Sequence, residues 1–190
     1  AILESEKLAA FGERLHFAEQ HSPEGFGHAV YQAKKFVGDE PFLLMLGDHV
    51  YISDTRERCA RQLIRVYEQY MLDAATSVQP TLERLLHLFG TIRGNPIDPA
   101  KGIYKAELIV EKPSIDVARE QLVTPGLPAG NYLCHFGQHV FSPQIFDCLE
   151  NLIKNDIREK GEIQLTAAQE LLRQQTDKYW VVHVQGQRYD

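Results

Sequence analysis

The chain of 190 residues carries 20 basic and 26 acidic side chains, a formal net charge of −6 at pH 7, which argues against non-specific binding of nucleic acid. Its hydrophobic fraction of 44% and charged fraction of 24% are ordinary for a globular protein, and its length suits one domain, 1–190. No apolar stretch approaches the roughly 20 residues of a membrane span, and the first residues do not resemble a secretory signal. Three widely spaced cysteines predict no disulfide framework, so a reducing, cytoplasmic setting is expected.

The first half of the chain predicts strands and helices in alternation. Residues 42–46 form an unbroken apolar run, which predicts a strand buried on both faces, as in a parallel sheet. Residues 56–71 place apolar side chains three and four positions apart and predict an amphipathic helix. The other elements expected in this half are a short strand at 15–19, a helix at 28–36 and a strand at 74–79 stopped by Pro80.

The second half continues the alternation. Thr166 and Gln169 match a capping box, which predicts a helix running to about residue 175. The remaining elements are a turn cluster at 94–99, strands at 103–111, 132–141 and 179–185, and a helix at 143–154. This order predicts an α/β fold with a mostly parallel mixed sheet and helices on both faces.

Asp48 follows the apolar run and Gly47 directly. A carboxylate at the carboxyl end of a buried strand lies where open α/β sheets bind ligands, so Asp48 is a candidate for metal or phosphate chemistry. A loop-capping aspartate is the alternative, and this stretch alone does not separate the two.

Two further segments contain residue types suited to a phosphorylated ligand. Gly25 and Gly27 would let the backbone approach an anion at the start of a helix, although this pattern is more often a tight turn. Lys112 could neutralise a phosphate, and Glu111 could accept hydrogen bonds from sugar hydroxyls. Because consecutive strand residues point to opposite faces, both reach one pocket only if the strand twists or ends there. A solvated ion pair is the alternative.

The remaining polar candidates lie in the second half of the chain. Glu162 and Gln164 alternate with apolar residues, so they are expected to share one face unless they are simply a polar lead-in to the helix. His135 and His139 would lie roughly 13 Å apart along an extended strand, too far to share one ion at bond lengths of ~2 Å. No zinc site is therefore expected, and no Gly-x-Ser-x-Gly turn supports a hydrolase triad.

Several short segments occur in the order typical of one enzyme family. They are Gln20 with 25–30, 37–42, 46–48, 110–113, 161–166 and 188–190. Together they resemble the sugar nucleotidyltransferase family, and the run at 161–166 resembles its uridylyl branch rather than the thymidylyl or adenylyl branches. The resemblance implies a Rossmann-like nucleotide-diphospho-sugar transferase fold. It also implies a magnesium-dependent reaction in which glucose-1-phosphate attacks the α-phosphorus of UTP, giving UDP-glucose and pyrophosphate.

The resemblance also assigns roles to individual residues. Asp48 and Asp190 would hold Mg²⁺, a hard ion that prefers carboxylate oxygens. Lys112 would bind the sugar phosphate and complete the catalytic set. The residues expected to bind the substrates are Gln20 and Gly25 at the uracil, and Gly90, Glu111, Gly137, Glu162 and Gln164 at or near the glucose.

The chain departs from the family at its start. It does not begin with Met, and nothing in it matches the family's Gly-x-Gly-Thr-Arg loop, which grips the triphosphate. It is therefore interpreted as the central and C-terminal part of one nucleotidyltransferase domain. Little activity of its own is expected, and an unpaired sheet edge could allow copies to associate. A non-catalytic sugar-nucleotide-binding or structural module, and a relative with another base or sugar, are the alternatives.

Overall fold

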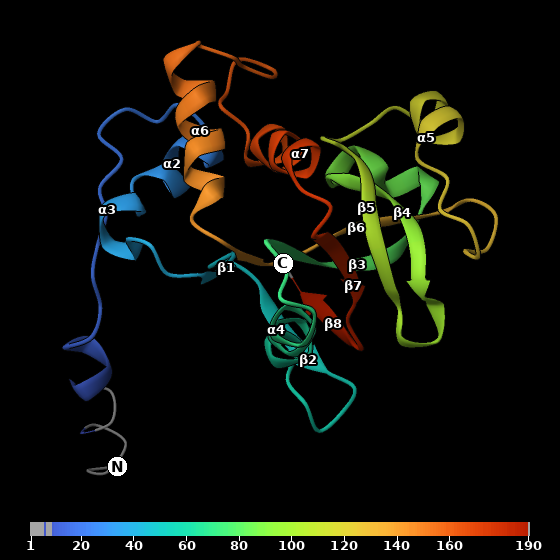
Figure 1. Ribbon diagram of the computed structural model, residues 1–190, viewed down its shortest axis with the longest axis horizontal. Coiled ribbons are helices and arrows are strands. Elements are labelled where there is room, and N and C mark those ends of the chain that lie inside the picture. The colour runs from blue at the N-terminus through green and yellow to red at the C-terminus, as the bar shows by residue number, and fades with distance from the viewer. Residues whose placement is uncertain (1–5, 7–8, 190) are drawn as a thin grey trace.

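Residues 6 and 9–189 are described by the computed structural model, in which helices cover both faces of a six-stranded mixed sheet (Figure 1). Across the sheet the strands are β1 (Phe42–Met45), β6 (Asn131–Phe141), β3 (Ala74–Leu82), β7 (Tyr179–His183), β5 (Ile103–Val110) and β4 (Thr91–Asp98). The α/β class expected from the sequence is confirmed. The expectation of mostly parallel pairing is wrong: among the described strand pairs only β3 and β7 run parallel, because β6 and β5 run in the opposite direction to their neighbours.

Helices pack on the two faces of this sheet. α2 (Phe26–Tyr31), α6 (Gln144–Lys154) and α7 (Leu165–Gln175) lie on one face, and α4 (Cys59–Tyr70) lies on the other (Figure 1). The shorter elements are α3 (Lys34–Val37), α5 (Ile115–Gln121), the 3₁₀ helices η1 (Glu83–Leu88) and η2 (Pro99–Lys101), and a separate pair of strands, β2 (Val50–Ser53) and β8 (Gly186–Tyr189). None of the described helices is long and apolar enough to cross a membrane.

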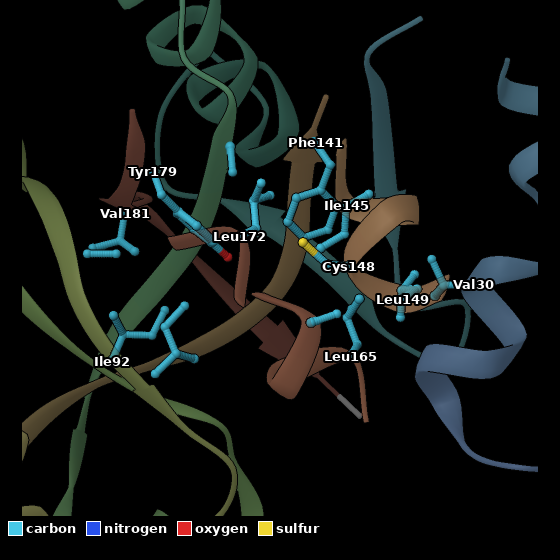
Figure 2. Close-up of a cluster of buried hydrophobic side chains, with 14 of the residues drawn as sticks. Val30, Ile92, Phe141, Ile145, Cys148, Leu149, Leu165, Leu172, Tyr179 and Val181 are labelled. Atoms are coloured by element: carbon cyan, nitrogen blue, oxygen red, sulfur yellow. The ribbon is translucent and has the colours of Figure 1, made fainter. Parts of the chain in front are cut away.

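Alternation along the strands divides the core between the two faces. In β3, Ala74 belongs to the cluster under α6 and α7, whereas Ala75 belongs to the cluster under α4, as expected for adjacent strand residues. Figure 2 shows the first cluster, in which Leu149 of α6 and Leu172 of α7 lie among strand residues such as Phe141. Burying one such side chain contributes about 1.5–3 kcal/mol, so these contacts hold the two helices on the sheet.

Two strands, β1 and β4, pair with different parts of one edge of the long strand β6. Phe141 pairs with both Phe42 of β1 and Ala74 of β3, and Leu133 pairs with both Ile92 of β4 and a residue of β3. β1 and β4 therefore lie on the same edge of β6, opposite β3. Between them, two backbone hydrogen bonds join residues 135–137 to their neighbours on this edge in the described part of the chain: His135 N to Gly90 O at 2.9 Å and Leu46 N to Gly137 O at 3.2 Å.

Three expected elements in the first half differ from the structure. Residues 15–19 form no strand, and the helix expected at 28–36 is divided into α2 and α3. The run at 42–46 forms the edge strand β1, which is only half-buried because no strand covers its outer edge within the described residues.

Prolines and capping residues account for the other differences. β3 continues through Pro80 to Leu82, since its pairing with β7 ends at Val78 and no N–H is needed there. The expected turn at 94–99 falls mostly within β4, whose register shifts after Arg93 and again after Pro96, as at bulges. The capping box is wrong because α7 already begins at Leu165, one residue before Thr166.

Candidate functional site

A cavity of about 370 Å³ lies where β1 and β4 leave the edge of β6. Its walls come from the segment after β1, the residues before β4, the end of β5 and the start of α7. Six of the residues expected to bind the substrates or act in catalysis line it: Gly90, Glu111, Lys112, Gly137, Glu162 and Gln164. The fold therefore brings together six residues that are up to 74 positions apart in the sequence (90 to 164).

Glu111 and Lys112 both reach this cavity because β5 ends just before them. The strand stops at Val110, and Lys112 adopts a left-handed backbone conformation with φ 42°. Side chains no longer alternate strictly between two faces once the strand has ended. Glu111 and Lys112 can therefore reach the same pocket, as their predicted roles require. Their charged groups lie 3.8 Å apart, and the Glu111 carboxylate, only 13% exposed, accepts a hydrogen bond from the Thr166 hydroxyl. The half-exposed Lys112 ammonium is the more available of the two for a ligand.

Glu162 and Gln164 share one face, as the alternation predicted. The amide of Gln164 donates to the Glu162 carboxylate at 2.9 Å, and the intervening Ile163 is buried in the core. The two side chains thus form one polar wall beside the start of α7.

Gly90 and Gly137 are glycines because the cavity wall has no room for a side chain. A Cβ on Gly90 would lie 2.7 Å from His135 Nδ1 and 3.1 Å from a Glu111 oxygen. A Cβ on Gly137, whose φ is +98°, would lie 2.7 Å from both His49 Nδ1 and the Tyr51 hydroxyl. A side chain at either position would therefore displace the polar groups around it.

Gln20 and Gly25 do not line the cavity, but Phe26 next to them does. The Gln20 amide donates to the Gly25 carbonyl at 3.1 Å. Gly25 packs against Ile163, whose carbonyl would be 2.7 Å from an added Cβ, and the Gly27 N–H donates to the same carbonyl at 2.9 Å. In the described structure, these glycines permit close packing of the backbone against the 162–165 segment.

Asp48 is not one of the residues that line the cavity, although its neighbours in the sequence Leu46 and His49 are. Its carboxylate is 84% exposed and lies 3.7 Å from His49 Nε2. Asp190 falls outside the described residues, so its distance from Asp48 is not part of the structure. The strand that precedes it, β8, pairs Tyr189 with Val50, two positions after Asp48.

Several lining residues were not predicted from the sequence to bind a ligand. Arg188 donates to the His135 carbonyl at 3.0 Å, with its guanidinium 4.5 Å from the Phe89 ring centre. His135, His139 and Gln169 form the inner wall. The position of the two histidines in the cavity wall could have been predicted from the sequence. Residues 135, 137 and 139 share one face of a strand, and Gly137 was already expected at the site.

The two histidine rings lie much closer than the sequence suggested. Their centres are 5.2 Å apart, because the left-handed Gly137 and a register shift between Thr76 and Val78 bend β6 and β3. Burial, followed by the positive charge of Arg188, lowers the pKa of His135 from 6.5 to about 4. Burial and the neighbouring His135 hold the pKa of His139 well below its usual value. Within the described part of the chain, no three His, Cys, Asp or Glu side chains cluster in a way that could hold a metal ion.

The fold and this cavity together define an α/β protein whose site suits a polar, phosphorylated small molecule. A family model described as nucleotidyl transferase matches residues 4–185. The chain belongs to the nucleotidyl transferase family.

Named relatives and solved structures agree with this assignment. The UTP–glucose-1-phosphate uridylyltransferase of Bacillus subtilis (strain 168) is 34% identical over 189 residues, which cover 100% of this chain and 58% of that protein. A structure described as UDP-glucose pyrophosphorylase complexed with UDP-glucose matches with a TM-score of 0.75 and 25% identity, over 92% of this chain and 60% of that one. A UTP-bound UGPase from Acinetobacter baumannii matches with a TM-score of 0.66 and 26% identity, over 100% and 62%. The chain thus spans less than two thirds of the length of these proteins.

Proposed function

We propose that this chain forms the sugar-binding side of an enzyme that transfers a uridylyl group from UTP to glucose-1-phosphate, giving UDP-glucose and pyrophosphate. The observation that carries the proposal is the pairing of Glu111 and Lys112 at the end of β5, in one cavity with Gly90 and Gly137. A cation beside a carboxylate suits a ligand that has both a phosphate and hydroxyl groups. The proteins named above add the specific base and sugar.

Each lining residue has a role that follows from its chemistry. Lys112 neutralises the phosphate of glucose-1-phosphate, and Glu111 and Glu162 accept hydrogen bonds from sugar hydroxyls. Gly90 and Gly137 lie beside the sugar and leave the polar side chains around them in place. Gln164 acts next to Glu162. Gln20 and Gly25, which lie outside the cavity wall, contact the uracil.

The reaction requires little covalent work from the protein. An oxygen of the sugar phosphate forms a new bond to the α-phosphorus of UTP, while the bond to the β-phosphate oxygen breaks and pyrophosphate leaves. Rate acceleration then comes from holding the two phosphates in line and from neutralising their charge. Lys112 acts on the attacking phosphate as a fixed cation.

Asp48 fits a divalent metal by its chemistry, because it presents an exposed carboxylate 3.7 Å from His49, which lines the cavity. Magnesium binds few protein carboxylates and completes its shell with water and phosphate oxygens. We propose that Asp48 and Asp190 hold Mg²⁺, which when bound neutralises charge on the reacting phosphates.

Isothermal titration of the 190-residue chain with nucleotide sugars tests the binding part of the proposal. UDP-glucose is expected to bind more tightly than ADP-glucose, dTDP-glucose or UDP-galactose. Lys112→Met should weaken binding of UDP-glucose on the order of tenfold to a hundredfold, the range for losing a hydrogen bond to a charged group. Lys101→Met is the matched control, since Lys101 pairs with Asp98 and does not line the cavity.

Equal affinity for all four nucleotide sugars, or no effect of Lys112→Met, would contradict the proposal. Turnover is a separate measurement. The chain contains no Gly-x-Gly-Thr-Arg run to hold the outer phosphates, so we expect it to release little pyrophosphate from UTP and glucose-1-phosphate. Rapid pyrophosphate release by this chain would overturn that expectation.

A further inference from the structure

The inner wall of the cavity is formed by three uncharged polar side chains, which we call the polar floor: His135, His139 and Gln169. The two histidines come from β6 and the glutamine from α7. His139 and Gln169 are almost fully buried. Buried polar side chains require partners, so the hydrogen bonds of the floor show which of its atoms are already used.

One half of the floor is fixed by a buried network. The Gln169 amide nitrogen donates to the Tyr179 hydroxyl at 2.9 Å and lies 3.1 Å from His139 Nδ1. The Thr76 hydroxyl also lies 3.1 Å from that nitrogen and 2.8 Å from the Tyr179 hydroxyl. Because an amide nitrogen can only donate, His139 Nδ1 accepts and the proton of the neutral ring is on Nε2. Gln169 and His139 are thereby held in one orientation.

The other half of the floor has unused hydrogen-bonding atoms. His135 Nε2 and Gln169 Oε1 are buried and have no hydrogen-bond partner among the described residues. Such atoms destabilise a folded protein unless something else pairs with them. Here they belong to side chains that line a cavity, so a ligand or an ordered water can supply the missing partners.

The floor also differs in charge from the rest of the cavity. Lys112, Arg188, Glu111 and Glu162 carry charge around it, whereas burial keeps both histidines neutral at neutral pH. A neutral imidazole and an amide oxygen suit a group that both donates and accepts hydrogen bonds without carrying charge. A hydroxyl has this property, and a phosphate or carboxylate does not.

We propose that His135 and Gln169, with His139 as their support, bind a hydroxyl group of the sugar that enters the cavity, and so determine which sugars are accepted. This inference rests on the proposed function, which supplies the sugar. A site built to hydrogen-bond a hydroxyl rejects an analogue without it, because its own polar atoms then stay unpaired.

His135→Phe tests the proposal by separating stability from binding. Phenylalanine removes the unpartnered nitrogen and keeps a ring of similar size beside Gly90. The variant is expected to unfold at the same or a higher temperature than the wild type. It should bind UDP-glucose on the order of tenfold more weakly, while its affinity for UDP, which lacks the glucose that would reach the floor, stays unchanged.

A second comparison uses wild-type protein and monodeoxy analogues of UDP-glucose. At least one analogue should bind on the order of tenfold more weakly than UDP-glucose, and His135→Phe should abolish that penalty. Gln169→Leu should reduce the same penalty, and Gln174→Leu is its matched control, because Gln174 lies on the same helix, is exposed and bonds only to Glu170 in the described structure.

The outcomes are distinguishable. If each deoxy analogue is still bound more weakly than UDP-glucose by His135→Phe, to the same extent as by the wild type, the floor binds only water and the inference is wrong. The same conclusion follows if the substitution weakens binding of UDP and UDP-glucose equally. If wild-type protein binds neither UDP nor UDP-glucose, the proposed function itself is wrong.

Discussion

Single residues in the cavity are determined by the space and hydrogen bonds around them. Gly137 illustrates this most directly, because its carbonyl accepts a hydrogen bond from the Tyr51 hydroxyl at 2.8 Å and its missing side chain leaves room for His49. Its left-handed φ of +98° adds a second reason for glycine.

Gly137→Ala is expected to lower both stability and ligand affinity. The new methyl group would displace His49 and Tyr51, and a non-glycine residue at this φ adds strain of about 1–3 kcal/mol. Gly126→Ala separates the two effects, since Gly126 has a similar φ of +88° and open space around its Cβ. Thermal unfolding and UDP-glucose titration of both variants check this. An equal loss of stability in Gly137→Ala and Gly126→Ala would show that the contact of the new methyl group with His49 and Tyr51 has no effect.

At the residue scale, the sequence predicted which residue types form the site better than it predicted the distances between them. The spacing of Glu162 and Gln164 predicted one shared polar face, which the structure confirms. The distance between His135 and His139 was overestimated, because an extended strand was assumed where a left-handed glycine bends β6. Such a bend depends on contacts with residues distant in sequence, which spacing alone does not reveal.

At the scale of elements, helices with clear apolar spacing were predicted well and strands at the edge were not. α4 and α6 fall within the ranges expected from their patterns. Pro96 lies within β4 and Pro99 directly follows it, and both residues favour a turn. β4 still pairs with β5, because bulges accommodate the irregular residues. Tertiary pairing therefore overrides local turn preference in this part of the chain.

The contact of α3 with α6 includes a cluster of four charges that should respond to acid, because Lys34 also lies 3.6 Å from Asp147. The Glu150 carboxylate lies 2.7 Å from Lys34 Nζ and 2.6 Å from Lys154 Nζ. Hydrogen bonds from Lys154 and Lys34 lower the pKa of Glu150 from 4.5 to about 2. Because the folded protein holds this carboxyl ionised, its stabilising effect is complete above pH 4.5 and is lost as the pH falls toward 2.

Glu150→Gln should therefore flatten the pH dependence of stability between pH 4.5 and 2. Urea unfolding at several pH values measures this. Glu40→Gln is the control, because Glu40 is exposed and makes no ion pair among the described residues. A Glu150→Gln profile parallel to the wild type over this range would contradict the expectation.

At the scale of the whole molecule, the outer edge of β1 is the least protected part of the sheet. No strand pairs with it among the residues that the structure describes, and Met45 on this strand is 43% exposed. Open edges allow pairing with another chain. An unpaired sheet edge was expected from the sequence, whereas the direction of most strand pairs was predicted wrongly.

We expect the 190-residue chain to self-associate through β1. Met45→Lys places a charge on the edge and should weaken association on the order of tenfold or more, as measured by sedimentation equilibrium. Met71→Lys is the matched control, because Met71 is exposed at the end of α4, away from β1. A wild-type chain that stays monomeric at high concentration would contradict the expectation.

The divided edge of β6 also affects how the cavity can change its width. At residues 135–137 each of its two walls is attached by one backbone hydrogen bond, to Gly90 and to Leu46. On the opposite edge, β3 pairs with β6 on both sides of a register shift between Thr76 and Val78. Widening the gap on either side of residues 135–137 breaks one backbone hydrogen bond, whereas β1 remains paired with residues 138–141 of β6 and β4 with residues 133–134. We expect a bulkier sugar to be accommodated by such local widening at Gly90 or Leu46, with the paired parts of the sheet kept in place.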